Sequence, residues 1–126
     1  MTLIMDAGAF VALERNDRAM WRRLESARLA GTPPRTHGGV VAQVWRGGGG
    51  RQALLARALH VVDTAPLDES LGRRAGVLLA RTGTSDAVGA AVAALARDGD
   101  VIVTSDPDDL GLLVEAAPGR ADVIRA

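Results

Sequence analysis

The stretch Val101-Ile-Val-Thr-Ser-Asp-Pro-Asp-Asp-Leu110 decides the fold, because it combines the clearest strand in the sequence with the start of a helix. Residues 101–104 are apolar or β-branched, which favours a buried strand. Asp106 and Pro107 then predict the first turn of a helix that reaches about Glu115. This segment therefore predicts one strand–helix unit of an α/β fold.

A second buried strand is predicted at the start of the chain, where residues 3–5 are apolar on both faces and run into Asp6. Helical spacing and turn signals alternate along the rest of the chain. The expected helices lie between residues 10 and 29 and at about 40–45, 52–59, 68–80 and 86–97, and weaker strands are expected at 35–39, 61–62 and 122–125. Short links between alternating strands and helices predict a single α/β domain, residues 1–126, whose parallel sheet is covered by helices on both faces.

Composition narrows the class of protein. The chain has 126 residues, of which 48% are hydrophobic, and this favours one folded domain with a real core. There is no cysteine, so disulfides and thiolate chemistry are excluded. No apolar run approaches the roughly 20 residues that span a bilayer, and no leader is visible, so a cytoplasmic protein without membrane contact is expected. The net charge is +0, which weakens any chain-wide attraction to nucleic acid, although every basic residue is an arginine.

Acidic residues follow both strong strands. Asp6 comes directly after the first strand, and Asp106 comes two residues after the second. Ligands of parallel α/β sheets bind beyond the carboxyl ends of the strands, where Asp86 at a helix start could add a third carboxylate. Clustered carboxylates repel one another unless a cation neutralises them. Oxygen ligands of this kind suit Mg²⁺ or Mn²⁺, which can activate water for phosphodiester hydrolysis.

Each of these acids also has a purely structural interpretation. Asp6 could cap the turn that follows its strand, Asp86 could be a helix N-terminal acid, and Asp106 could be an ordinary N-cap before Pro107. Thr104 could orient Asp106 through its hydroxyl group or could be a normal strand residue.

Four segments together resemble the PIN domain of VapC-type toxins. These segments are residues 3–9 around Asp6, residues 41–48 around Gln43, residues 83–88 around Asp86, and residues 101–110. The resemblance covers nearly the whole chain in the family's order. It implies a Rossmann-like sheet, Mg²⁺ or Mn²⁺ as cofactor, endoribonuclease activity on RNA such as tRNA or rRNA, inhibition by a small VapB-type antitoxin, and a homodimer.

The resemblance assigns roles position by position. Asp6, Asp86 and Asp106 match three acids of the family's catalytic and metal-binding set, and Thr104 matches the hydroxyl residue beside the last one. Two positions depart from the pattern. Gln43 stands where the family has Glu, and Gly89 stands where similar relatives often have Asp. The resemblance therefore implies an attenuated ribonuclease toxin, and the alternative is a catalytically impaired PIN-like protein that acts through dimerisation and antitoxin binding.

Other polar side chains have weaker assignments. Arg46 and Arg51 could contact RNA phosphates or an antitoxin carboxylate, or they could be solvated surface residues. Trp45 is expected in the core or in a dimer contact rather than in base stacking. His37 and His60 are expected at the surface, away from the acids.

Overall fold

A five-stranded parallel sheet forms the centre of the molecule in a computed structural model that describes residues 1–126. Its strand order is β3-β2-β1-β4-β5, and every neighbouring pair is parallel. The strands are β1 (Leu3–Met5), β2 (Arg35–His37), β3 (Asp63–Ala65), β4 (Val101–Thr104) and β5 (Asp122–Arg125). The predicted α/β fold with a parallel sheet is confirmed.

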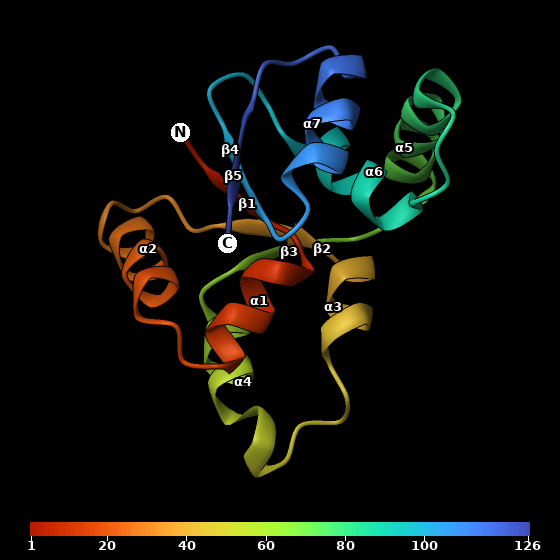
Figure 1. The fold of residues 1–126 in the computed structure, drawn as a ribbon. Coiled ribbons are helices and arrows are strands. Elements are labelled where there is room, and N and C mark those ends of the chain that lie inside the picture. Colours follow the sequence, from red (N-terminus) through yellow and green to blue (C-terminus); the bar gives the residue numbers. More distant parts are fainter.

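Two groups of helices enclose this sheet (Figure 1). The helices are α1 (Ala7–Glu14), α2 (Arg18–Leu29), α3 (Gly38–Val44), α4 (Ala53–His60), α5 (Glu69–Thr82), α6 (Ala87–Leu95) and α7 (Pro107–Ala116), with one 3₁₀ turn, η1 (Gly50–Gln52). Helix α1 packs against α2, α3 and α4, whereas α5, α6 and α7 pack against one another. The chain builds outward from β1 to β3, then returns to the centre and builds outward in the other direction to β5. Right-handed crossovers in opposite directions place the two helix groups on opposite faces.

The core lies where the central strands meet α1 and α6. Ile4, Met5 and Ile102 are fully buried on the strands, and Phe10 from α1 is buried against them. Helix α6 is rich in alanine, and its residues 89–93 are all buried. This agrees with the prediction from its apolar sequence, because a helix that is apolar nearly all round must be covered on most sides. Small side chains let α6 approach β1 and β2 closely.

One predicted strand lies in a different place. The sequence favoured residues 61–62, but β3 begins at Asp63, after the turn that follows α4. The backbone N–H of Asp63 donates to the carbonyl of Pro34 over 2.8 Å, and β2 and β3 pair from Arg35 opposite Asp63 onward. Val62 is buried in the turn instead. The hydrophobic residues 61–62 therefore belong to a turn beside the strand. The strand β3 itself is largely exposed, so hydrophobicity does not identify it.

No helix combines the length and the apolar character needed to cross a bilayer. The longest, α5, has 14 residues.

Candidate functional site

The candidate site lies at the carboxyl edge of the two central strands. In the parallel pairing of β1 and β4, Met5 lies opposite Val103. The N–H of Asp6 extends this pairing by donating to the carbonyl of Val103 over 3.0 Å. The chain adds strands from β1 toward β3 on one side of the sheet and from β4 toward β5 on the other side. Such a change of direction leaves a crevice at the carboxyl ends of the two central strands, where ligands of open α/β sheets bind.

Thr104 joins Asp6 to the Asp106 segment. Its side chain is completely buried, and its hydroxyl donates to Oδ2 of Asp6 over 2.9 Å. The same hydroxyl oxygen accepts the backbone N–H of Asp106 over 3.0 Å. Oδ1 of Asp6 accepts the N–H of Ala7 over 2.8 Å. Both oxygens of Asp6 are thus held by hydrogen bonds, and the hydroxyl of Thr104 is used as donor and as acceptor.

Three helices start with an aspartate at or near this edge. Asp6, Asp86 and Asp106 are the N-caps of α1, α6 and α7. Oδ1 of Asp86 accepts the N–H of Gly89 over 3.0 Å, so this carboxylate caps its own helix. Asp106 is exposed, and its side chain makes no capping bond. The partial positive charge of helix N-termini stabilises anionic groups there, so the capping interpretation holds for Asp6 and Asp86, while the carboxylate of Asp106 remains free.

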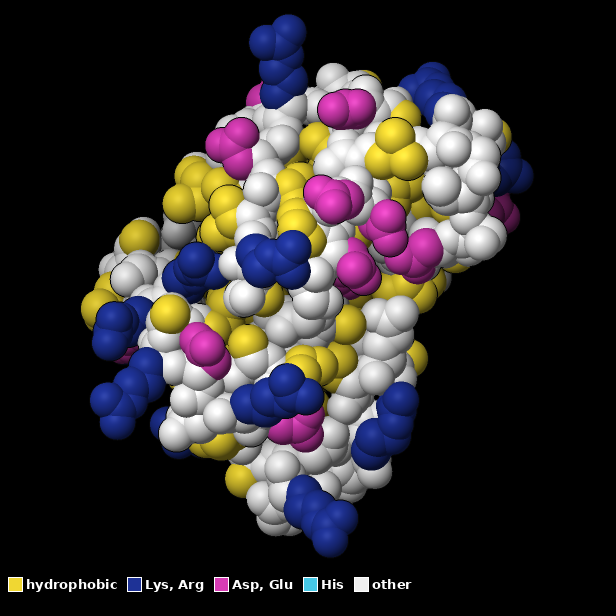
Figure 2. Space-filling model, viewed as in Figure 1, with side chains coloured by type: hydrophobic (Ala, Val, Ile, Leu, Met, Phe, Trp, Pro, Cys, Tyr) yellow, Lys and Arg dark blue, Asp and Glu magenta, His cyan; other side chains and the backbone are white.

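The donor set suits a hard divalent cation in kind. Carboxylate oxygens are the ligands that Mg²⁺ prefers, and waters commonly complete its octahedron. Asp6 and Asp106 are connected through Thr104, and Figure 2 shows several acidic side chains gathered on this face. No group of three or more His, Asp or Glu side chains is close enough together to hold a metal ion in the structure. Asp6 and Asp106, linked through the hydroxyl of Thr104, form an acid pair, whereas Asp86 lies at the start of the neighbouring helix α6.

Gln43 and Gly89, the two positions singled out in the sequence, lie on different helices. Gln43 is exposed on the last turn of α3, which packs against α1, and its amide makes no side-chain hydrogen bond. Gly89 is buried in the first turn of α6. A Cβ atom at Gly89 would collide with Oδ2 of Asp86, so the Asp86 carboxylate covers this glycine. The absence of a side chain at Gly89 lets Asp86 adopt its capping position.

His37 was predicted at the surface, and this is wrong. It is completely buried at the end of β2, where its Nδ1 accepts the N–H of Gly39 and its Nε2 lies 3.0 Å from the carbonyl of Val88. A carbonyl can only accept, so the ring is neutral and carries its proton on Nε2. Burial lowers the pKa of His37, while the hydrogen bond to Val88 and the charge of Asp6 oppose that shift. His37 thereby fastens the start of α3 to α6.

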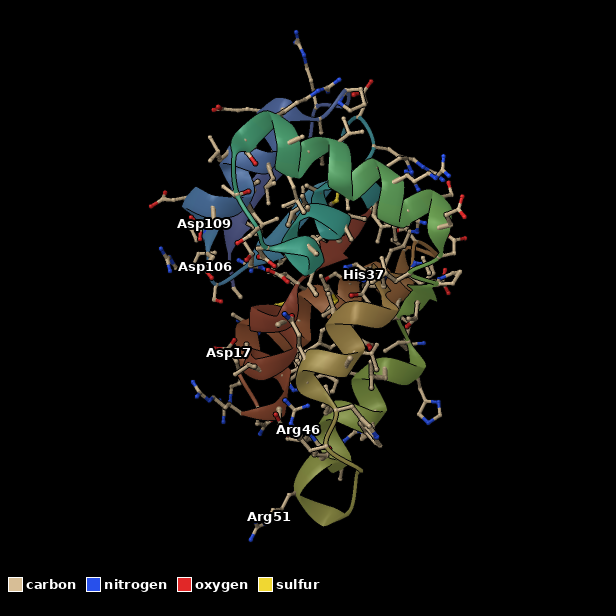
Figure 3. The ribbon with its side chains drawn as sticks, turned by 90° about the vertical axis from the view of Figure 1, so that its right-hand side faces the viewer. Asp17, His37, Arg46, Arg51, Asp106 and Asp109 are labelled. Carbon is tan, nitrogen blue, oxygen red and sulfur yellow. The ribbon has the colours of Figure 1, made fainter.

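The two arginines proposed as contacts differ in position. The guanidinium of Arg46 donates to the carbonyls of Ala42 and Trp45, and it follows the end of α3. Arg51 is exposed in η1 and makes no side-chain hydrogen bond. Figure 3 shows Arg46 between Asp106 and Arg51, with Arg51 at the far end of the molecule. Trp45 is 37% exposed, so it is only partly covered.

Sequence reasoning missed a cation that lies beside the Asp106 segment. Arg125 on β5 lies in register with Thr104, and its guanidinium donates to the carbonyl of Ser105 over 3.2 Å. This bond places a positive charge beside the residue that precedes Asp106. The parallel pairing of a carboxyl-terminal strand with β4 was the signal that could have identified it.

Comparison with known proteins adds no family. Neither the scan against protein-family models nor the search of curated proteins found a match for this chain.

Proposed function

We propose that this chain is a metal-dependent endoribonuclease of the PIN type, acting as the toxin of a VapBC-type pair. The observation that carries the proposal is the connection from Asp6 through Thr104 to Asp106 at the switch point of a parallel sheet. The same residues carry the resemblance to VapC-type PIN domains. A chain with no net charge and an acidic edge fits a nuclease that binds a metal cation, which in turn binds the phosphate of the substrate.

Asp6 and Asp106 would hold Mg²⁺ or Mn²⁺ together with waters, and the resemblance to PIN domains adds Asp86 as a third ligand. When bound, the ion supplies a water activated for attack and offsets charge on the phosphate. Thr104 holds the carboxylate of Asp6 in one orientation by its 2.9 Å hydrogen bond. The carboxylate of Asp106 has no hydrogen-bond partner and is therefore free to turn toward an ion. The guanidinium of Arg125, on the other side of Ser105, supplies a positive charge for the substrate.

The proposed partners follow from the same resemblance. A single-stranded region of tRNA or rRNA is the substrate, a small VapB-type antitoxin is the inhibitor, and two copies form the working unit in the cytoplasm. An arginine of the antitoxin would neutralise the acidic edge in the inhibited complex, because a guanidinium forms bidentate hydrogen bonds with a carboxylate. Arg46, which is exposed at the end of α3, is available to an acidic residue of the same partner.

A second candidate function is a PIN-like binding protein without catalysis. Two observations favour it. One carboxylate oxygen of Asp86 caps its own helix, and position 43 carries an amide instead of a carboxylate. Both reduce the number of carboxylate oxygens that are free to bind a cation. This protein would dimerise and bind its antitoxin without cleaving RNA.

Cleavage of pooled tRNA and rRNA in the presence of Mn²⁺ distinguishes the two functions. The parent chain should cleave, and Asp6→Asn should not, although asparagine remains a good N-cap and keeps the fold. Asp63→Asn is the matched control, because Asp63 is exposed at the start of β3 and makes no side-chain hydrogen bond.

Gln43→Glu completes the experiment. An inactive parent with an active Gln43→Glu variant would identify a nuclease disabled at one position. Inactivity of both chains would favour the binding protein. Equal cleavage by the parent and by Asp6→Asn would contradict the assignment of the site.

A further inference from the structure

A hollow of about 530 Å³ opens directly beside the acid pair. Ala7 and Ser105 form part of its wall, and they are the sequence neighbours of Asp6 and Asp106. The hollow continues along α1 away from the sheet edge. In Figure 3, Asp17 at its outer end and Asp106 beside its inner end lie on the same side of the molecule. A ligand bound at the acidic edge could therefore extend directly into this hollow.

The lining combines an apolar surface with free polar groups. Val11 and Ala12 contribute the apolar part from α1, and both are half-buried. Arg15 is exposed and has neither an ion-pair partner nor a side-chain hydrogen bond, and the hydroxyl of Ser105 is also unbonded. Asp17 is different, because its Oδ1 already accepts the N–H of Met20 over 2.9 Å. A guanidinium and a hydroxyl are thus available to a ligand that lies on the apolar surface.

The wall nearest to the acids is fixed in place. A Cβ atom at Gly8 would lie 2.6 Å from the backbone nitrogen of Ser105, so α1 approaches this segment as closely as glycine permits. Arg125 donates to the carbonyl of Ser105, and the N–H of Ala126 donates to the carbonyl of Thr104 over 2.8 Å. These contacts keep the hollow formed without a ligand, which reduces the entropy cost of binding.

We propose that this hollow binds one unpaired base of single-stranded RNA, while Arg125 holds the adjoining phosphate next to Asp106. Unstacked bases lie against guanidinium planes and offer their edges to hydrogen bonds, which matches Arg15 and Ser105. A guanidinium also fits the geometry of phosphate oxygens, which matches Arg125. The inference rests on the proposed function, because it adds to the same site a pocket for one base of the single-stranded substrate. A base inside a duplex cannot enter, so paired RNA is excluded.

Binding of a fluorescein-labelled, mixed-sequence 12-nucleotide single-stranded RNA, followed by anisotropy in EDTA, tests the proposal without cleavage. Ala12→Phe narrows the hollow and should weaken binding about tenfold, and Arg15→Ala should weaken it by a similar factor. Ala80→Phe on the exposed side of α5 and Arg97→Ala after α6 are the matched controls and should bind like the parent. The fully paired duplex of the same RNA should not respond to Ala12→Phe.

Two outcomes overturn the pocket. One is unchanged affinity in Ala12→Phe and Arg15→Ala when thermal unfolding shows both variants to be folded. The other is a parent that does not bind the single strand. Failure of the proposed function has a separate signature, because cleavage in Mn²⁺ depends on Asp6 and binding in EDTA does not. A parent that loses binding in Ala12→Phe but never cleaves RNA would support the pocket and contradict the nuclease. A parent that cleaves RNA in an Asp6-dependent manner but binds independently of Ala12 would do the reverse.

Discussion

The hydroxyl of Thr104 donates a 2.9 Å hydrogen bond to the carboxylate of Asp6, and this bond joins residues that are 98 positions apart in the sequence. It links the carboxyl ends of β1 and β4 at the point where the sheet changes direction. Because the same hydroxyl accepts the N–H of Asp106, one buried side chain positions both segments of the acid pair.

Replacing Thr104 with valine should destabilise the protein by about 1–3 kcal/mol, although the shape of the side chain is kept. The substitution leaves the N–H of Asp106 without its acceptor and Asp6 without its donor. Thr104→Ser keeps the hydroxyl and should retain Mn²⁺-dependent cleavage, whereas Thr104→Val should lose most of it. Urea unfolding and the RNA assay measure both effects. Full stability and activity of Thr104→Val would show that this hydroxyl does not organise the site.

Gly8 and Gly76 should respond in opposite directions to alanine. A Cβ at Gly8 meets the backbone of Ser105 at 2.6 Å, whereas nothing lies within 4 Å of the corresponding atom at Gly76 on α5. We expect Gly8→Ala to cost about 1–3 kcal/mol because backbone must move, and Gly76→Ala to stabilise the helix by about 0.5–1 kcal/mol. Thermal unfolding of the two variants gives the comparison. Equal effects would mean that α1 is not packed tightly on the Ser105 segment.

The stability of the protein should fall as the pH is lowered below about 6.5, through the effect of His37. The pKa of His37 is lowered in the folded chain, chiefly by burial, so the unfolded chain binds a proton that the folded chain does not. The free energy of unfolding then decreases toward acid by up to about 1.4 kcal/mol per pH unit, until the folded histidine also titrates.

Urea unfolding between about pH 7.5 and 5.5 tests this window, which lies above the ordinary pKa of carboxylates. His60→Gln serves as the control, because His60 is exposed, and it should leave the slope unchanged. A flat profile in the parent would contradict the buried, neutral state of His37.

Gly89→Asp should remove the N-cap of α6 and add a carboxylate that can bind a metal ion. The new side chain would displace the Asp86 carboxylate that covers Gly89, and loss of that cap should cost about 1 kcal/mol in EDTA. The added carboxylate should make Mn²⁺ raise the melting temperature more than it does in the parent. Gly72→Asp on α5 is the control, since nothing lies near its Cβ position. An identical response to Mn²⁺ in the parent and in Gly89→Asp would place residue 89 outside the site.

The sequence was most informative where burial and secondary structure agree. Residues 3–5 and 101–104 are apolar and lie at the centre of the sheet, so periodicity and turn signals were sufficient to place β1 and β4. The same reasoning failed for β3, which is exposed and contains Asp63 and Thr64. A short edge strand is defined by its hydrogen bonds to β2 rather than by hydrophobic burial, and a local pattern does not contain that information.

The site was predicted in outline and not in its contacts. Acids at strand ends indicated that Asp6 and Asp106 would share one edge, because adjacent parallel strands bring their carboxyl ends together. The burial of His37 and the position of Arg125 depend on which strands become neighbours, and only the sheet order fixes that. Capping by Asp86 was weighed as an alternative to ligation, and the structure shows the capping bond.

Binding of Mn²⁺ is the most direct test of the account, because the proposed ribonuclease activity depends on a cation at the acidic edge. Free Mn²⁺ can be followed by electron paramagnetic resonance as the parent, Asp106→Asn and Asp63→Asn are added. The account predicts that the parent and Asp63→Asn bind Mn²⁺ equally, and that Asp106→Asn binds it at least about tenfold more weakly. Equal binding by the parent and Asp106→Asn, or no binding by the parent, would contradict it.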